Sequence, residues 1–286
     1  MADQTRSSSV QQEPPVVPGS SSSGYEPPAW FWQSRVKGPS QSSAILFTGL
    51  RTLDVSLQYW LLKSNAIANV IGEYRIAPGA LGVTTTATTL GLNPYQSIIL
   101  GLSVGAALKQ IYWNHAINNE VFAAPFATLI AAYNTVFNCV NTGFAIWAVT
   151  SQIPSAQSSL GSFITSMPMS IPIGLMLYSI GLFVEWYSEI QRKRFKADPR
   201  NAGKPYSGGL FGFARSINYG GYTLWRTGYA LVCGGWLWAG AVLAWNAGDF
   251  CNRAIPSMDA YCEKRYGRQW DEVRSKVPYS LLPWIY

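Results

Sequence analysis

A long stretch of this chain carries no charge. From Val121 to Val184 the sequence contains no Asp, Glu, Lys or Arg, and the segments 76–108 and 227–248 are also free of them. A helix needs roughly 20 apolar residues to cross a bilayer, so the first of these windows can hold two crossings. The core of a soluble protein gives no reason to avoid charge over such a length. The sequence therefore predicts an all-α polytopic membrane helix bundle.

The apolar segments and their flanks predict how the chain is organised. We expect a disordered tail rich in Ser, Pro and Gln, then N-terminal membrane helices, then a C-terminal membrane domain, at residues 1–43, 44–160 and 161–286. Candidate crossings lie at 44–62, 95–113, 121–150 and 163–186. Residues 78–92, rich in Gly and Thr, could form a poor crossing or a buried loop. The expected total is about 6–7 membrane-embedded helices.

The net charge of +7 is unevenly placed, because residues 185–286 hold 14 basic and 8 acidic residues. Basic loops of membrane proteins are commonly cytosolic, so we expect the loop 191–206 and the C-terminus to face the cytosol and expect no nucleic-acid partner. The apolar segment 221–253 lies between two basic segments, which a single crossing would place on opposite sides of the membrane. A helical hairpin that turns at Gly234–Gly235 keeps both on one side, and we expect that arrangement.

The last helix is expected at about 256–276 and is amphipathic. Its apolar side chains recur at spacings of four and three and form one stripe, made of Met258, Cys262, Tyr266, Trp270, Val273 and Val277. Charged residues occupy its other faces, and Pro278 ends it. Such a helix can lie on a membrane surface without contributing to a site, or it can close over one.

Arg51 and Asp54 place two charges inside the first candidate crossing. They are three residues apart and so lie on neighbouring faces of a helix. Charge within a membrane is costly and points to a functional site by default. Two interpretations stay open, namely a functional site and an ion pair that satisfies itself inside the bundle.

The histidine and cysteine content of the sequence predicts neither a metal site nor disulfide bonds. His115 is the only histidine, which excludes a multi-histidine metal site. The four cysteines show no CxxC spacing, so we expect neither a disulfide framework nor a thiolate metal site.

The segment from Gly181 to Leu231 gathers the charge that the apolar runs lack. An apolar run ends in Glu185 and Glu189, and six basic residues follow, namely Arg192, Lys193, Arg194, Lys196, Arg200 and Lys204. A glycine-rich turn then leads into the next apolar run. Charge packed between two membrane-like segments lies at a membrane–water boundary. Lys and Arg side chains and free backbone N–H groups could bind an anion there.

Two motifs in this part of the chain carry a resemblance to a known family. The first consists of Glu185, Glu189, Gln191, Arg192, Phe195, Lys196, Gly209-Leu210-Phe211, Arg215, Asn218, Tyr219 and Gly221. The second consists of Cys262, Arg265, Tyr266, Gly267, Trp270, Val277-Pro278-Tyr279 and Tyr286. In this order and spacing they resemble the C-terminal half of the steroid 5α-reductase and sterol reductase superfamily, and most closely an uncharacterised membrane branch of it. The resemblance covers roughly residues 160–286.

The resemblance implies a membrane enzyme, with the endoplasmic reticulum as the expected location, that binds NADPH on its cytosolic side. NADPH would reduce a double bond of a lipid-like substrate such as a sterol, steroid or enone. Carried over by position, the cofactor site would consist of Arg192, Lys196, Arg215, Asn218, Tyr219, Arg265 and Tyr266. Gly220–Gly221 would let the backbone approach the ligand closely. Candidate proton donors are Tyr222, Tyr219 and Glu185.

The chain also departs from the pattern of that superfamily. The His-Pro of the family motif is Ser216–Ile217 here, and the acid that follows the motif glycine is Tyr222. A similar signature occurs in membrane methyltransferases that use S-adenosylmethionine. Two alternatives therefore stay open, namely such a methyltransferase and a non-catalytic membrane protein of the same fold that binds a lipid.

Overall fold

The computed structural model describes residues 38, 40–64, 90–152 and 167–286, and within these ranges the chain is helical with no β-strand. The α-helices are α2 (Gln41–Lys63), α4 (Pro94–Tyr112), α5 (Ala124–Gln152), α7 (Ser170–Ala197), α8 (Ile217–Asp249), α9 (Ile255–Tyr266) and α10 (Arg268–Lys276). The predicted all-α class is confirmed. The segment 78–89, nearly all of the expected tail and most of the link after α5 lie outside the described residues.

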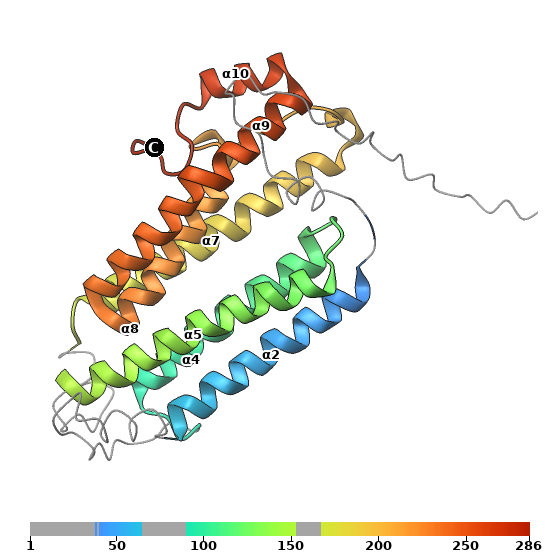
Figure 1. Ribbon diagram of the computed structural model, residues 1–286. Helices are drawn as coiled ribbons and strands as arrows, with labels where there is room; N and C mark the ends of the chain where they lie inside the picture. Colours follow the sequence, from blue (N-terminus) through green and yellow to red (C-terminus); the bar gives the residue numbers. More distant parts are fainter. Residues whose placement is uncertain (1–37, 39, 65–89, 153–166) are drawn as a thin grey trace, which may run out of the picture.

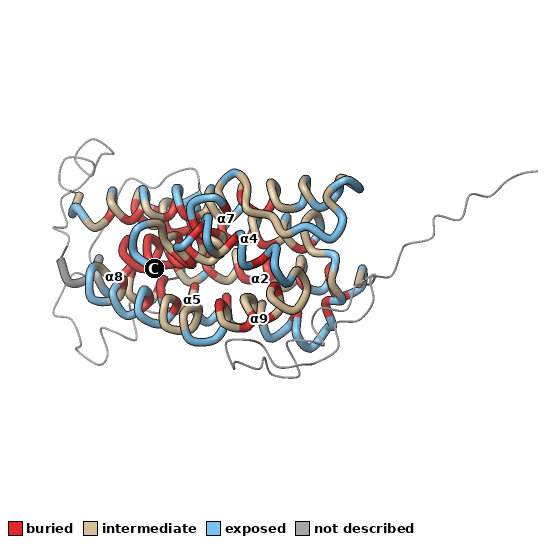
Figure 2. Tube along the Cα trace, turned by 90° about the horizontal axis from the view of Figure 1, so that it is seen from above, coloured by how far each residue is buried: buried red, intermediate tan, exposed pale blue. Residues whose placement is uncertain are grey.

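The long helices lie roughly side by side in two groups (Figure 1). One group consists of α2, α4 and α5, and the other of α7 packed along α8. The two groups meet where α5 and α4 contact α8. Seen from above, the buried residues follow the inner sides of the helices (Figure 2). The core between the groups includes Trp225, Tyr229 and Ile99, none of which is exposed.

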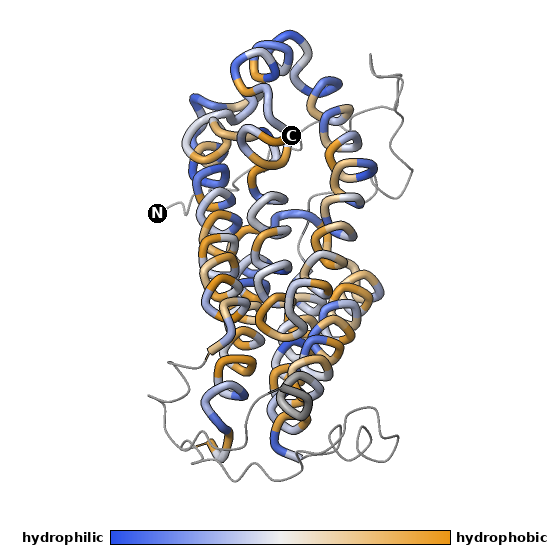
Figure 3. Tube along the Cα trace, turned by 90° about the vertical axis from the view of Figure 1, so that its left-hand side faces the viewer, coloured by the Kyte–Doolittle hydropathy of each residue, from blue (hydrophilic) through white to orange (hydrophobic). Residues whose placement is uncertain are grey.

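Many large apolar side chains face outward. Leu237 is 90% exposed and Leu129 is 65% exposed, whereas Asn138, Asn141 and Thr142 are buried. Hydrophobic residues run along the length of the bundle, and hydrophilic residues gather toward the end that holds the C-terminus (Figure 3). A bilayer favours apolar side chains on the outside of a bundle and polar side chains turned inward. The surface therefore agrees with a membrane protein.

Two of the described helical segments are long and apolar enough to cross a membrane, Ser170–Ala197 and Ile217–Tyr266. The first begins later than the expected crossing at 163–186 and continues further, through the basic residues at its end. Those cations stabilise the C-terminal end of a helix, where the helix dipole is negative. The count of 6–7 membrane-embedded helices stays a prediction.

The hairpin expected at Gly234–Gly235 is present inside α8. Gly235 has φ 70° and ψ −165°, a backbone conformation that is essentially restricted to glycine. The two arms of α8 then run back along each other, which brings Tyr219 against Phe250 with ring centroids 4.7 Å apart. In a straight helix these residues would lie more than a membrane thickness apart. Both basic segments consequently lie at the same end of the bundle (Figure 1).

Glycines hold α7 and α8 in close contact. A Cβ on Gly221 would lie 2.6 Å from the backbone N of Glu185, and one on Gly228 would lie 2.5 Å from the backbone N of Tyr178. Small residues let the backbones of membrane helices approach closely. This contact fixes the position of Glu185 relative to the first arm of α8.

The single last helix expected at 256–276 is wrong, because it is two helices. Gly267 has φ 52° and separates α9 from α10. The apolar stripe is nevertheless real: Cys262, Trp270 and Val273 are buried together, with Met258 and Tyr266 packed against them. The bend folds the stripe onto itself, so that α10 covers α9 rather than extending it.

Candidate functional site

Glu185 joins three helices near the basic end of the bundle. Its Oε1 accepts a hydrogen bond from Nζ of Lys109 on α4, with which it also forms an ion pair. Its Oε2 accepts a hydrogen bond from Nε1 of Trp225 on α8 at 2.6 Å. The side chains of Lys109 and Glu185 are 8% and 14% exposed. The Lys109 ammonium also lies over the rings of Tyr222 and Trp225. Sequence analysis assigned Lys109 no role, because its partner lies on a distant helix.

Tyr222 contacts an arginine that sequence analysis did not assign to the site. Nε of Arg226 donates to the Tyr222 hydroxyl oxygen at 3.0 Å, and Nη2 of Arg226 donates to Oδ1 of Asn134. Arg226 is only 2% exposed. Among the described residues, none accepts a hydrogen bond from the Tyr222 hydroxyl. The charge-free chain that follows Arg226 was the signal that could have identified it.

Four aromatic rings surround the Arg226 guanidinium. Its central carbon lies 4.5 Å from the ring centroid of Trp225 and 5.2–5.8 Å from three others, which belong to Phe137, Tyr222 and Tyr133. Rings facing a cation stabilise it where water is excluded. Tyr133 and Phe137 belong to α5, so the four rings surround Arg226 only when α5 packs on α8.

Tyr219 lies one turn before Tyr222 on the same arm of α8. Its ring stacks on Phe250, which directly follows the second arm of α8, and the Tyr222 ring meets the same Phe250 edge-on with centroids 5.5 Å apart. The structure thus brings together the three predicted proton donors, with Glu185 linked to Tyr222 through Lys109 and Trp225.

Glu189 forms a second carboxylate centre one turn along α7. Its Oε1 accepts from Nδ2 of Asn218 at 2.8 Å, and its Oε2 accepts from Nη2 of Arg192 at 2.5 Å. Glu189 is 5% exposed, while the Arg192 side chain is 39% exposed. A small cleft beside it is lined by both carboxylates and by residues of α4 and the turn after it, including Lys109, Tyr112 and Trp113. Arg192 and Asn218, predicted for the cofactor site, therefore meet at one acid.

Lys196, Arg265 and Tyr266 come together where the end of α7 meets α9. Nζ of Lys196 donates to the Tyr266 hydroxyl at 2.9 Å and lies 4.8 Å from the centroid of its ring. The Arg265 guanidinium carbon is 5.6 Å from the same centroid, and Arg265 donates to the hydroxyl of Tyr261. Two cations on one partly exposed ring make a positive surface that can bind phosphate.

Arg215 binds the C-terminal segment instead of joining these groups. Its Nη1 donates to the backbone oxygens of Val277 and Pro278 at 2.8 and 2.9 Å, and its Nη2 donates to Oγ of Ser280. Arg215 also lies 3.6 Å from Asp259 of α9, beyond the apolar arms of the hairpin. Burial raises the pKa of Asp259, and the charge of Arg215 opposes that rise.

Gly220 and Gly221, expected to approach a ligand, approach protein backbone instead. A Cβ on Gly221 would collide with Glu185, and one on Gly220 would collide with the carbonyl oxygen of Leu281. Glycine is required at both positions because another backbone segment comes close, as expected from the sequence. That segment is α7 at Gly221 and the C-terminal segment at Gly220, and not a ligand.

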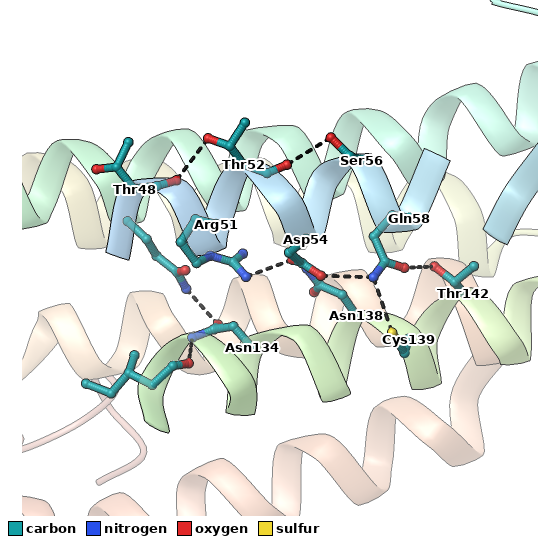
Figure 4. Close-up of polar contacts among 12 residues, drawn as sticks. Thr48, Arg51, Thr52, Asp54, Ser56, Gln58, Asn134, Asn138, Cys139 and Thr142 are labelled. Carbon is teal, nitrogen blue, oxygen red and sulfur yellow. Dashed lines mark hydrogen bonds and ion pairs between the residues drawn. The ribbon is translucent and has the colours of Figure 1, made fainter. Parts of the chain in front are cut away.

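Arg51 and Asp54 head a buried polar row between α2 and α5 (Figure 4). Nη1 of Arg51 donates to Asp54 Oδ2 at 2.7 Å, and neither side chain is exposed. The same carboxylate accepts from Asn138 at 2.7 Å and from Gln58 at 3.0 Å, and Gln58 accepts from Thr142. The ion pair, one of the two interpretations left open by the sequence, is present in the bundle interior and is embedded in a longer network than the sequence indicated.

The chain is part of a steroid and sterol reductase-like superfamily. Residues 84–252 match the model of a family described as "Protein of unknown function (DUF1295)". This match covers more than half of the chain, which therefore belongs to that family.

Two relatives bear on function. The chain is 34% identical over 235 residues to the probable O-methyltransferase ustE of Ustilaginoidea virens, covering 80% of this chain and 81% of that protein. It is 24% identical over 197 residues to the Delta(14)-sterol reductase ERG24B of Gibberella zeae. The second match covers 50% of this chain and 41% of the reductase.

Proposed function

We propose that this protein is a membrane reductase that uses NADPH to reduce a carbon–carbon double bond of a lipid-like substrate such as a sterol, steroid or enone. Membership of the reductase-like superfamily and the sterol reductase relative support a lipid reductase. The observation that carries the proposal is the contact of Tyr222 with Arg226, at 3.0 Å beside the Lys109–Glu185 pair. It provides a proton donor next to the basic end, where a nucleotide would bind.

The cations at this end suit the phosphates of a dinucleotide. Lys196 is exposed, Arg192 is partly exposed, and Lys196 and Arg265 share the ring of Tyr266. Arg and Lys bind phosphate strongly, and an aromatic ring offers a stacking face to a base. In this proposal Arg192, Lys196, Arg265 and Tyr266 hold the phosphate-bearing part of NADPH. Tyr219 and Asn218 lie between this phosphate-binding part and Tyr222.

Tyr222 has the geometry of a general acid. NADPH supplies the hydride when it is bound, and the second carbon of the double bond needs a proton. The Tyr222 hydroxyl can give that proton, because the hydrogen bond from Arg226 occupies the oxygen and leaves the O–H free. Arg226 then stabilises the phenolate that remains, as an adjacent cation favours the charged form. Glu185 neutralises Lys109 and holds Trp225 against this group.

The proposal is tested by NADPH consumption with a panel of sterols and enones, comparing wild type with Tyr222→Phe. Phenylalanine keeps the ring contacts and removes the proton, so turnover should fall by about 10²–10⁴-fold while NADPH affinity stays the same. Equal turnover in both proteins would exclude Tyr222 as the acid. A loss of NADPH binding instead would assign it to the cofactor site.

A second function has one observation in its favour, the relative named as a probable O-methyltransferase. In that case the cations would bind S-adenosylmethionine, and Tyr222 or Glu185 would help to remove the proton of a substrate hydroxyl. Retention of S-adenosylmethionine but not NADPH by the solubilised protein would support the methyltransferase. Retention of neither would support a non-catalytic lipid-binding protein.

A further inference from the structure

In the part of the bundle interior that the structure describes, buried arginines outnumber the carboxylates beside them. Arg51 is fully buried and Arg226 is 2% exposed, and the two guanidinium groups are close enough to interact electrostatically. Asp54, 2% exposed, is the carboxylate that the described residues place beside Arg51. Lys109 is neutralised separately by Glu185. Among the described residues, two buried arginines and one buried aspartate leave one positive charge without a counter-charge beside it.

Several donors of these two arginines have no partner among the described residues. Nε and Nη2 of Arg51 and Nη1 of Arg226 are buried and make no hydrogen bond there. The other guanidinium nitrogens bond to Asp54, Tyr222 and Asn134. An unpaired buried donor costs roughly 1–3 kcal/mol, and more when it is charged. Both the missing charge and the missing acceptors would be supplied by a single oxyanion.

We infer that Arg51 and Arg226 bind the carboxylate of an amphiphile, a molecule with one negative head and an apolar body, such as a long-chain fatty acid. One uncompensated positive charge fits a monoanion. A carboxylate offers about four lone-pair positions for guanidinium donors. The four rings around Arg226 and the core residues Tyr229 and Ile99 supply apolar surroundings. Because Nε of Arg226 holds Tyr222, the bound head would lie next to the proposed general acid.

The test is saturable binding of radiolabelled oleate to the full chain in a neutral detergent, without NADPH. We expect unlabelled oleate to displace the label, and oleyl alcohol and acetate not to. Displacement by oleyl alcohol would mean that the site recognises only the apolar body. Displacement by acetate would mean a site for small anions, and no saturable binding would mean no site. Each of these results overturns the inference.

Two variants and a control identify the residues. Arg226→Gln should weaken oleate binding about tenfold or more, because it removes a charge-assisted contact. Asp54→Asn should strengthen binding, because it removes the carboxylate that competes for Arg51. Arg253→Gln removes an exposed arginine paired with Asp249 and should change nothing. If the arginines only hold the helices together, Asp54→Asn should lower the melting temperature and leave oleate affinity unchanged or weaker. That result would contradict the inference, and it can be obtained even if Arg226→Gln does not fold.

Discussion

The ring of Tyr219 stacks on that of Phe250, with centroids 4.7 Å apart and ring planes 5° apart. This contact closes a hairpin whose turn depends on Gly235. A Cβ at Gly235 would meet no atom within 4 Å, so Gly235→Ala tests backbone strain alone. The backbone conformation there should cost alanine about 1–3 kcal/mol. Thermal unfolding followed by circular dichroism measures it.

Gly240→Ala is the matched control, because it also has open space around it but lies in ordinary helix. It should be neutral or stabilise the protein by up to about 1 kcal/mol. Equal melting temperatures for the two variants would show that the turn does not need glycine.

A methyl group at Gly181 should separate α7 from α8. It would collide with the backbone of Trp225 and Gly221, so we expect Gly181→Ala to destabilise the protein by about 1–3 kcal/mol or more. Gly101→Ala on α4, with no atom within 4 Å, should be tolerated. If both variants melt like wild type, the close contact between α7 and α8 is not required for stability.

Trp270 should anchor the folded-back pair of helices α9 and α10. It is 5% exposed, and truncating a packed aromatic typically costs about 3–5 kcal/mol, so Trp270→Ala should lower the melting temperature clearly. Trp284→Ala removes a tryptophan that is 77% exposed and should change stability by less than about 0.5 kcal/mol. Similar effects of the two substitutions would mean that α10 does not pack on α9.

The two basic segments should face the same compartment. Cysteines introduced at the exposed positions Ala197 and Gln269 should react together with a membrane-impermeant reagent, and from the cytosolic side, since both neighbourhoods are basic. Labelling from opposite sides would contradict the hairpin in the membrane. Labelling of both from the lumen would leave the hairpin intact and reverse the orientation.

The sequence predicted the hairpin and missed the break at Gly267, and the reason is physical. Basic residues on both sides of an apolar segment indicate that its two ends lie on the same side of the membrane. The chain must then turn back somewhere inside the segment, wherever the turn is. The apolar stripe, in contrast, keeps its spacing across Gly267, and Trp270 lies on it whether the helix is straight or bent. Periodicity therefore could not detect the bend; the glycine was the available signal.

Glu185, Tyr219 and Tyr222 were named as candidate proton donors from the family resemblance, and the structure places them near one another; their role stays a prediction. The pairing of Lys109 with Glu185 and the rings of Tyr133 and Phe137 around Arg226 depend on how α4 and α5 pack, which spacing along the chain does not encode.

The most direct test of the proposed function is a titration of the solubilised protein with NADPH and, separately, with S-adenosylmethionine, at two salt concentrations. The account predicts saturable NADPH binding to wild type. Lys196→Ala should bind it more weakly and with a smaller salt dependence, because one phosphate-binding cation is lost. Lys276→Ala, an exposed cation on α10, should behave like wild type. Binding of S-adenosylmethionine without NADPH, or of neither, would contradict the reductase.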